Sequence, residues 1–177
     1  MRLFVAIDIP KEIRDTMRAL LDRLRPIAKI NWTPPDNLHI TTKFIGEWPE
    51  ARLDEVKTVL SGIQSQGSIQ IGVRNIGWFP NPKRPHVLWA GIEAGANLAE
   101  LAFQTSHAVA TLGIAEEDRP YSPHLTLARI REAIPLTALR SALDSFGDFD
   151  FGSFNAHEFF LYQMLGGRYI KLAAYSL

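Results

Sequence analysis

The sequence predicts an α+β protein in which two antiparallel-sheet lobes face each other across a central cleft. Each half of the chain contains one strand-like His-apolar-Thr motif, at His39–Thr41 and at His124–Thr126. Each motif is followed, after a nearly equal interval, by a proline that can open a helix, and both halves show the order helix, His strand, helix, strand, strand. Strands that come in pairs after every second helix favour antiparallel sheets. We therefore expect one bilobal domain over residues 1–177, duplicated internally as roughly 10–93 and 96–176, with a pseudo-two-fold axis and the helices outside.

The first half is expected to begin with a buried strand and an amphipathic helix. Residues 3–7 are apolar and bounded by Asp8 and Pro10, as expected of a short buried strand. Pro10 opens a helix and Pro26 stops it. Between them, apolar residues recur at helical spacing: Ile13, Met17, Leu20, Leu21 and Leu24.

The first histidine strand is expected at 38–45, between a loop at 30–37 and Gly46. Pro49 then begins a second helix. Alternating residues at 69–73 and the apolar run at 86–92 indicate two strands joined across a proline-rich loop, and we expect them to pair as a hairpin.

The second half repeats this order. A third helix follows Gly95 and ends near Gly113, and a loop then leads to the second histidine strand. Pro135 opens a fourth helix. An aromatic-rich strand region follows at 149–162, and the Gly166–Gly167 pair predicts a hairpin turn into a last strand at 169–175.

Composition narrows the chemistry. Lys plus Arg and Asp plus Glu balance at 19 each, so no global positive field draws the protein to nucleic acid, and any phosphate contact must be local. The absence of cysteine excludes disulfides, thiolate metal sites and a cysteine nucleophile. Since no segment resembles a signal peptide or a membrane span, we expect a cytoplasmic protein with no membrane contact.

The two His-x-Thr pairs are the candidate catalytic groups. In a strand, residues i and i+2 point to one face, so each imidazole has a hydroxyl beside it. Two imidazoles with an ordinary pKa of about 6.5 suit a reaction that needs both an acid and a base at neutral pH. The hydroxyls of Thr41 and Thr126 could hold an anionic substrate. One such motif is more often structural, but its recurrence at equivalent places favours hydrolysis of a phosphodiester.

Several other residues could contribute. Arg129 could hold a phosphate, although strict alternation places it on the opposite face from His124 unless the strand bulges. Phe44, Tyr121, Trp32 and Trp78 could stack a nucleobase, although such rings are more often part of the core or of a cleft wall. No metal site is expected, because neither motif histidine has a second ligand at the right spacing. Lys83 and Arg84 in the proline-rich loop are the nearest approach to a basic patch.

Together these stretches resemble the two-histidine (2H) phosphoesterase superfamily. Within it they are most similar to the bacterial and archaeal RNA 2′,3′-cyclic phosphodiesterases, long called 2′-5′ RNA ligases. The resemblance spans nearly the whole chain. It is carried by residues 2–7, the first motif with Phe44 and Gly46, residues 77–80 leading to 87–91, and above all residues 123–129.

The resemblance implies a 2H phosphoesterase-like fold and a single catalytic domain. It implies metal-independent hydrolysis of an RNA terminal 2′,3′-cyclic phosphate to a 2′-phosphomonoester, with reversible 2′-5′ ligation at the same site and no cofactor. By position, His39 would be the proton donor and His124 the proton acceptor. Thr41, Thr126 and Arg129 would hold the phosphate, with Phe44 and Tyr121 as further substrate contacts.

The substrates implied are RNA ends with a 2′,3′-cyclic phosphate, with tRNA fragments as candidates, or small cyclic nucleotides, and a monomer is expected. Family members often carry a serine and a longer connection near the final hairpin, whereas this chain has Met164 and a tight turn. Substrate contacts from that edge therefore stay open. Two alternative functions also stay open: an RNA-end or nucleotide-binding module with little turnover, and a related phosphodiesterase acting on 2′-5′ oligonucleotides or small cyclic phosphates.

Overall fold

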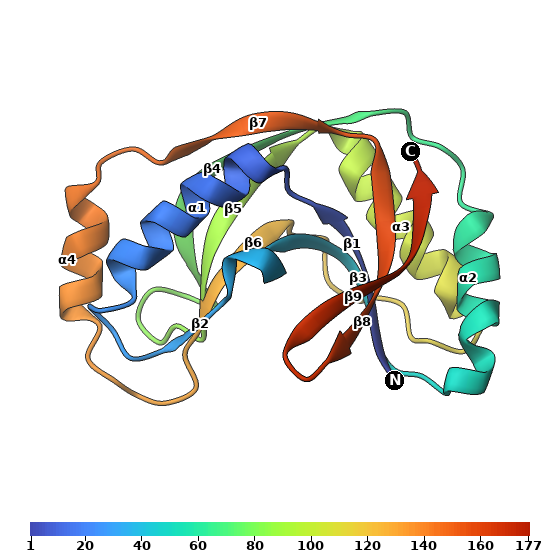
Figure 1. Ribbon diagram of the computed structural model, residues 1–177, viewed down its shortest axis with the longest axis horizontal. Coiled ribbons are helices and arrows are strands. Elements are labelled where there is room, and N and C mark those ends of the chain that lie inside the picture. Colours follow the sequence, from blue (N-terminus) through green and yellow to red (C-terminus); the bar gives the residue numbers. More distant parts are fainter.

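Two antiparallel sheets form the framework of the computed structural model, which describes residues 1–177 (Figure 1). The first sheet has the strand order β3-β1-β8-β9 and the second the order β2-β6-β5-β4-β7. The strands are β1 (Arg2–Asp8), β2 (Asn31–Trp32), β3 (His39–Glu47), β4 (Ile69–Phe79), β5 (Val87–Ala94), β6 (His124–Arg129), β7 (Asp150–Ala156), β8 (Glu158–Leu165) and β9 (Arg168–Ser176). The predicted α+β class is confirmed.

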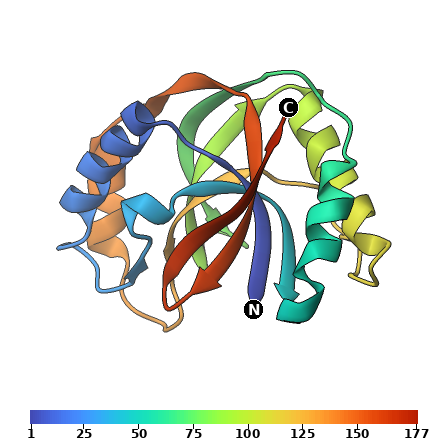
Figure 2. The same cartoon turned by 45° about the vertical axis from the view of Figure 1, so that its right-hand side comes forward.

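The four helices lie in pairs at the two outer sides of the sheets (Figure 2). They are α1 (Lys11–Leu24), α2 (Leu53–Ser61), α3 (Ala96–Ala110) and α4 (Thr137–Ser145). Helix α1 contacts β7 of the second sheet, whereas α3 packs against β3 of the first sheet and against α2. None of the four is long and apolar enough to cross a membrane.

Alternation in β1 divides the apolar side chains between two clusters. Leu3, Val5 and Ile7 join the main core, which extends between the sheets and the helices. Phe4 and Ala6 point to the other face and form a small separate cluster with Phe160 and Tyr162. Strand β1 of the first sheet is therefore buried on both faces, and the His39 ring from the neighbouring strand β3 packs against Phe4 on the second face.

The predicted hairpin of residues 69–73 and 86–92 is confirmed, because β4 pairs with β5. The predicted turn at Gly166–Gly167 also lies where expected, between β8 and β9, and both glycines have positive φ. The predicted single strand region at 149–162 is wrong in one respect: it contains two strands that belong to different sheets. Strand β7 pairs with β4 and β8 pairs with β1, so the chain crosses between sheets at His157.

The sheets do not follow the two predicted repeats. The first sheet combines β3 from residues 10–93 with β8 and β9 from residues 96–176, and the second combines β4 and β5 with β6 and β7. Each range therefore supplies strands to both sheets, and neither forms a sheet by itself. Strands β3 and β6 contact each other between the sheets (Figure 1). The duplication itself stays a prediction.

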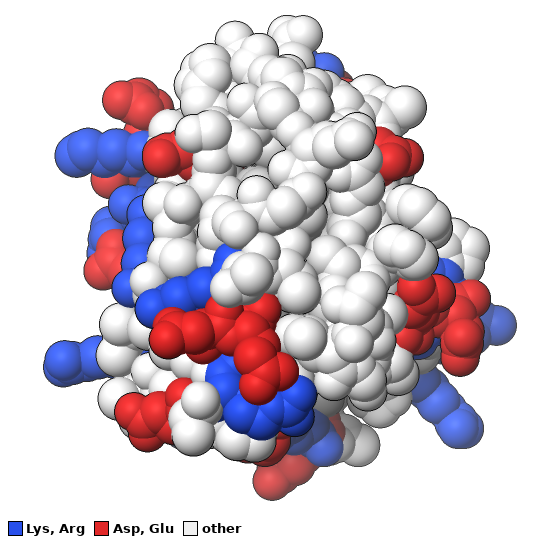
Figure 3. All heavy atoms as spheres, turned by 90° about the vertical axis from the view of Figure 1, so that its right-hand side faces the viewer, with Lys and Arg blue, Asp and Glu red and all other residues white.

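Charges on the outer helices are interleaved. On the face that carries α2 and α3, cations and carboxylates lie side by side (Figure 3). On α2, Lys57 pairs with Asp54 and the adjacent Arg52 pairs with Glu55. Charges of both signs therefore lie close together on this face.

Gly77 of β4 leaves room for an indole ring. A Cβ placed on it would lie 2.0 Å from Trp89 Cζ2, so Gly77→Ala has to displace Trp89. We expect the free energy of unfolding to fall by about 1–3 kcal/mol, the usual cost of overpacking. Urea denaturation measures this. Gly62→Ala is the control, because the nearest atom to its added Cβ is at 3.5 Å, and an equal loss in both variants would contradict the steric explanation.

Candidate active site

Matching irregularities shape the two histidine strands. The pairing of β3 with β1 shifts between Val5 and Ala6, and that of β6 with β5 shifts between Leu88 and Trp89. Both strands show the same burial order: half-buried, buried, half-buried, two buried residues, then an exposed one. A bulge accounts for the two successive buried residues in each strand.

The bulges decide which side chains share a face. On β3 the face of His39 and Thr41 continues to Phe44, whose side chain is 42% exposed. On β6 the face of His124 and Thr126 continues to Arg129. The condition that the sequence set for Arg129, a bulge before it, is therefore met.

Each motif histidine is oriented by a carbonyl two residues earlier. His39 Nδ1 lies 2.6 Å from the Asn37 oxygen, and His124 Nδ1 lies 2.8 Å from the Ser122 oxygen. A carbonyl oxygen can only accept, so each Nδ1 carries the hydrogen and donates it. This leaves Nε2 of each ring as the atom that can take or give a proton.

Aromatic rings pack against both imidazoles. His39 lies against Phe4, with ring centroids 4.7 Å apart, and against the edge of Tyr169 at 5.0 Å. His124 meets Phe79 edge-on at 5.1 Å. Burial is the main reason why the pKa of both histidines lies below the ordinary value. The positive charge of Arg129 lowers both pKa values further, and that of His124 also lowers the pKa of His39. These three groups therefore share one electrostatic environment.

The two histidines differ in one neighbour. Asp8 of β1 is the register partner of His39, whereas the register partner of His124 is Gly91. The Asp8 carboxylate raises the pKa of His39 and so opposes the effect of burial. The carboxylate is held by the Tyr162 hydroxyl, which donates to it, and by Lys171 Nζ at 2.5 Å. Only His39 has a carboxylate residue as its register partner.

Tyr121 links the two motifs. Its hydroxyl donates to the Thr41 carbonyl at 3.0 Å, although Tyr121 itself immediately precedes the Ser122 carbonyl that orients His124. Burial raises the pKa of its phenol. The sequence proposed Tyr121 as a substrate contact, and the structure gives its hydroxyl a partner within the protein.

A buried lysine anchors the same loop. Lys43, only 3% exposed, donates to the Ala115 carbonyl at 2.6 Å and lies 3.6 Å from a Glu117 oxygen. Residues 115–121 are thus attached to β3 by Lys43 and by Tyr121. Sequence reasoning missed this role, although a lysine within an apolar strand, at the point where alternation breaks, was the available signal.

Other residues that the sequence singled out lie elsewhere. Trp32 donates to the Ala28 carbonyl and packs on the main core, and the ring of Trp78 is covered by the guanidinium of Arg140 at 4.7 Å. Met164 packs against the Phe4 cluster. No three potential metal-ligating carboxylate, imidazole or thiol groups lie together.

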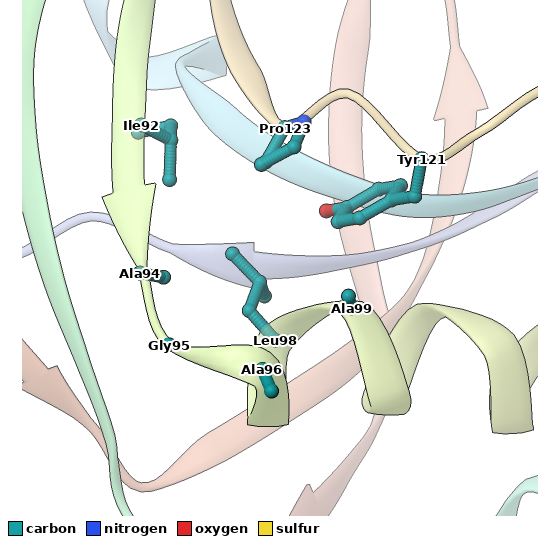
Figure 4. A pocket seen from close by; sticks show the side chains of 8 residues that line it. All are labelled: Ile92, Ala94, Gly95, Ala96, Leu98, Ala99, Tyr121 and Pro123. Carbon is teal, nitrogen blue, oxygen red and sulfur yellow. The ribbon is translucent and has the colours of Figure 1, made fainter.

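An apolar pocket of about 270 Å³ lies next to the second motif, and Pro123 forms part of its wall (Figure 4). Its wall includes the Tyr121 ring, Ile92 of β5 and Leu98 of α3. Tyr121 is the only titratable residue that lines it. The groups suited to proton transfer therefore lie outside this pocket, at His39 and His124.

Known proteins share both the sequence and the arrangement. Residues 7–89 match the family model described as LigT like Phosphoesterase. The RNA 2′,3′-cyclic phosphodiesterase of Methanocaldococcus jannaschii is 35% identical over 163 residues, which are 92% of this chain and 91% of that protein. The chain belongs to the LigT-like phosphoesterase family. The enzyme of the same name from Aeropyrum pernix is 37% identical over 67% of each chain.

Solved structures of LigT-like phosphoesterases extend the match to the whole fold. The crystal structure of TT0787 of Thermus thermophilus has a TM-score of 0.81 and 29% identity, covering 100% of this chain and 98% of that one. LigT of E. coli, complexed with 3′-AMP, has a TM-score of 0.78 and 26% identity, covering 99% and 97%. The resemblance to two-histidine phosphoesterases is confirmed.

The hydrogen bond between the Tyr121 hydroxyl and the Thr41 carbonyl can be tested by its contribution to the free energy of unfolding of this LigT-like protein. Tyr121→Phe removes the hydrogen bond to the partly buried Thr41 carbonyl, so the free energy of unfolding should fall by about 1 kcal/mol. Tyr169→Phe is the matched control, because no hydrogen bond is found for the Tyr169 hydroxyl. Chemical denaturation compares the two, and equal stabilities would argue against the link between the motifs.

Proposed function

We propose that this protein hydrolyses the terminal 2′,3′-cyclic phosphate of RNA to a 2′-phosphomonoester. The observation that carries the proposal is the pair of imidazoles in one electrostatic environment, each with Nδ1 held by a carbonyl and Nε2 left for proton transfer. The shared name of the relatives, RNA 2′,3′-cyclic phosphodiesterase, supports the choice of substrate. We propose that the enzyme acts in the cytoplasm, as expected from the sequence.

In the proposed mechanism, His124 Nε2 takes a proton from water as the water oxygen attacks phosphorus. The bond from phosphorus to the 3′ oxygen breaks, and His39 Nε2–H protonates that oxygen. The products are a 2′-phosphate and a 3′-hydroxyl. His124 ends protonated and His39 neutral, and exchange with solvent restores both.

The hydroxyls of Thr41 and Thr126 are proposed to donate to the non-bridging oxygens, and Arg129 to balance their charge. Phe44, exposed on the same face as His39, is available to the terminal nucleoside. If the 5′-hydroxyl of another RNA replaces water, the same steps form a 2′-5′ linkage. Both acid and base come from the chain, so the scheme requires no metal ion.

Asp8 supports the assignment of roles. A general acid must hold its proton until the transition state, and a neighbouring carboxylate favours the protonated imidazole. His39 has Asp8 as its register partner, and His124 has only Gly91. The asymmetry favours His39 as the acid and His124 as the base.

The central test uses His39→Ala and His124→Ala. Each should reduce hydrolysis of a 2′,3′-cyclic mononucleotide by about 10²–10⁴-fold without unfolding the chain, because each group transfers a proton. Chromatography of the products should show only the 2′-phosphate from the wild type, at a rate unchanged by excess chelator. A 3′-phosphate product, or full activity in either variant, would overturn the mechanism. Binding of a cyclic-ended RNA without turnover would favour the binding-module alternative.

The pH profile tests the role of Asp8. The pKa of both histidines lies below the ordinary value of about 6.5, so kcat/KM should have its maximum on the acid side of that pH. Rising pH removes the proton from the acid His39, and falling pH protonates the base His124. Asp8→Asn removes a charge that favours protonated His39, so the basic limb should move further towards acid pH while the acidic limb stays.

Asp22→Asn, which changes an exposed carboxylate on α1 that pairs with Arg25, is the control and should leave both limbs in place. A shift of the acidic limb in Asp8→Asn would exchange the roles of the histidines. If neither limb of the pH profile shifts in Asp8→Asn, Asp8 does not influence the protonation of His39.

A further inference from the structure

Five cations gather at the end of β6 that is remote from His124. Two are Lys83 and Arg84 in the loop between β4 and β5, two are Arg129 and Arg131 at the end of β6, and the fifth is Arg140 on α4. We call this group the basic corner. The formal charge of the whole chain is zero, so the corner is a local excess of positive charge.

Three contacts bring these segments together. Val87, which ends the loop, is the register partner of Arg129, and the Ile130 N–H donates to the His86 carbonyl at 2.8 Å. The Arg140 guanidinium donates to the Pro82 carbonyl. The loop, the end of β6 and α4 therefore form one continuous surface.

The loop is held in one shape. The Asn81 side-chain oxygen accepts from the backbone N–H groups of both Lys83 and Arg84, each at 3.0 Å. Prolines at positions 80, 82 and 85 restrict the backbone further. A loop with a fixed backbone loses less entropy on binding than a mobile one.

The cations of the basic corner lack acidic partners within the protein. None of the five forms an ion pair, in contrast to the interleaved charges over α2 (Figure 3). The one carboxylate in the loop from 130 to 136 is Glu132. Cations without internal partners are available to replace the counterions of a phosphate backbone.

Arg129 connects the basic corner to the site. It shares a face with His124 and Thr126, and its charge acts on the pKa of both histidines. An RNA strand whose end lies at the histidines, and which runs along β6 away from them, passes Arg129 before it reaches the loop between β4 and β5. Of the two aromatic rings next to the loop, Trp78 is covered by Arg140 and Phe79 packs against Trp89 and His124, so the surface offers cations for phosphates rather than a free ring for base stacking.

We propose that the basic corner binds the phosphates of the single-stranded RNA that precedes the cyclic end, without regard to base sequence. The inference rests on the proposed function and adds to it the part of the substrate beyond the terminal nucleotide. It predicts that a cyclic-ended oligoribonucleotide is a better substrate than a cyclic mononucleotide, and that the advantage disappears at high salt.

The test compares these two substrates in the double variant Lys83→Gln/Arg84→Gln. For the oligoribonucleotide at low salt, kcat/KM should fall roughly tenfold, and the slope of its logarithm against the logarithm of salt concentration should become less negative by about 1.4, which is about 0.7 for each phosphate that the variant no longer neutralises. For the mononucleotide, kcat/KM should not change, which also shows that the variant is folded. Lys11→Gln/Lys57→Gln, on the outer faces of α1 and α2, makes the same change in net charge and should have no effect on either substrate.

A double variant that keeps the wild-type rate and salt slope with the oligoribonucleotide would overturn the inference. An equal reduction in the control variant would overturn it too, because the effect would then come from total charge. If the wild type fails to hydrolyse even the mononucleotide, the proposed function itself has failed, and direct binding of the oligoribonucleotide to the two variants, measured by fluorescence anisotropy, then decides the inference on its own.

Discussion

The hydrogen bond from a histidine ring to a carbonyl two residues earlier is the constraint on which this site depends. It appears twice, at His39 and His124, and in both places it settles the ring orientation and the tautomer. It also makes the chain before each strand part of the catalytic geometry. The 3₁₀ turn of residues 35–37 and the Ser122–Pro123 segment hold the acceptors, while β3 and β6 hold the rings.

The two sheets bring the two oriented histidines together, because β3 and β6 belong to different sheets and contact each other. Because β3 is bonded to β1 and β6 to β5, each histidine lies on a strand held within a separate hydrogen-bonded ladder. Neither lobe can be built from one continuous stretch of sequence. The core that the two sheets share then fixes the position of one histidine relative to the other. The two sheets are also joined directly by the chain at His157, where β7 of the second sheet is followed by β8 of the first.

Much of this was accessible from the sequence, for clear physical reasons. Apolar periodicity located the helices, and recurrence identified the two His-x-Thr strands. Periodicity could not predict which strands pair with each other in the sheets. The division of residues 149–162 between two sheets depends on which distant strand each half meets, and no local pattern encodes that choice. The bulges were a stated condition for Arg129 but could not be predicted, since two successive buried residues look like any apolar pair. Asp8, Lys43 and Asn37 were missed because their importance lies in partners far away in the chain.

Asn37 has two bonds that point in different directions. Its carbonyl accepts from His39, and its side-chain amide donates to the Gly167 carbonyl at the tip of the β8–β9 hairpin, 2.9 Å away. The tip of that hairpin and the orientation of the His39 ring are therefore connected through one residue. Displacing the hairpin tip would strain the hydrogen bond of the Asn37 amide, on the same residue whose carbonyl orients the imidazole. The tight turn thus contributes to the first motif through Asn37, although Asn37 and Gly167 lie 130 positions apart in the sequence.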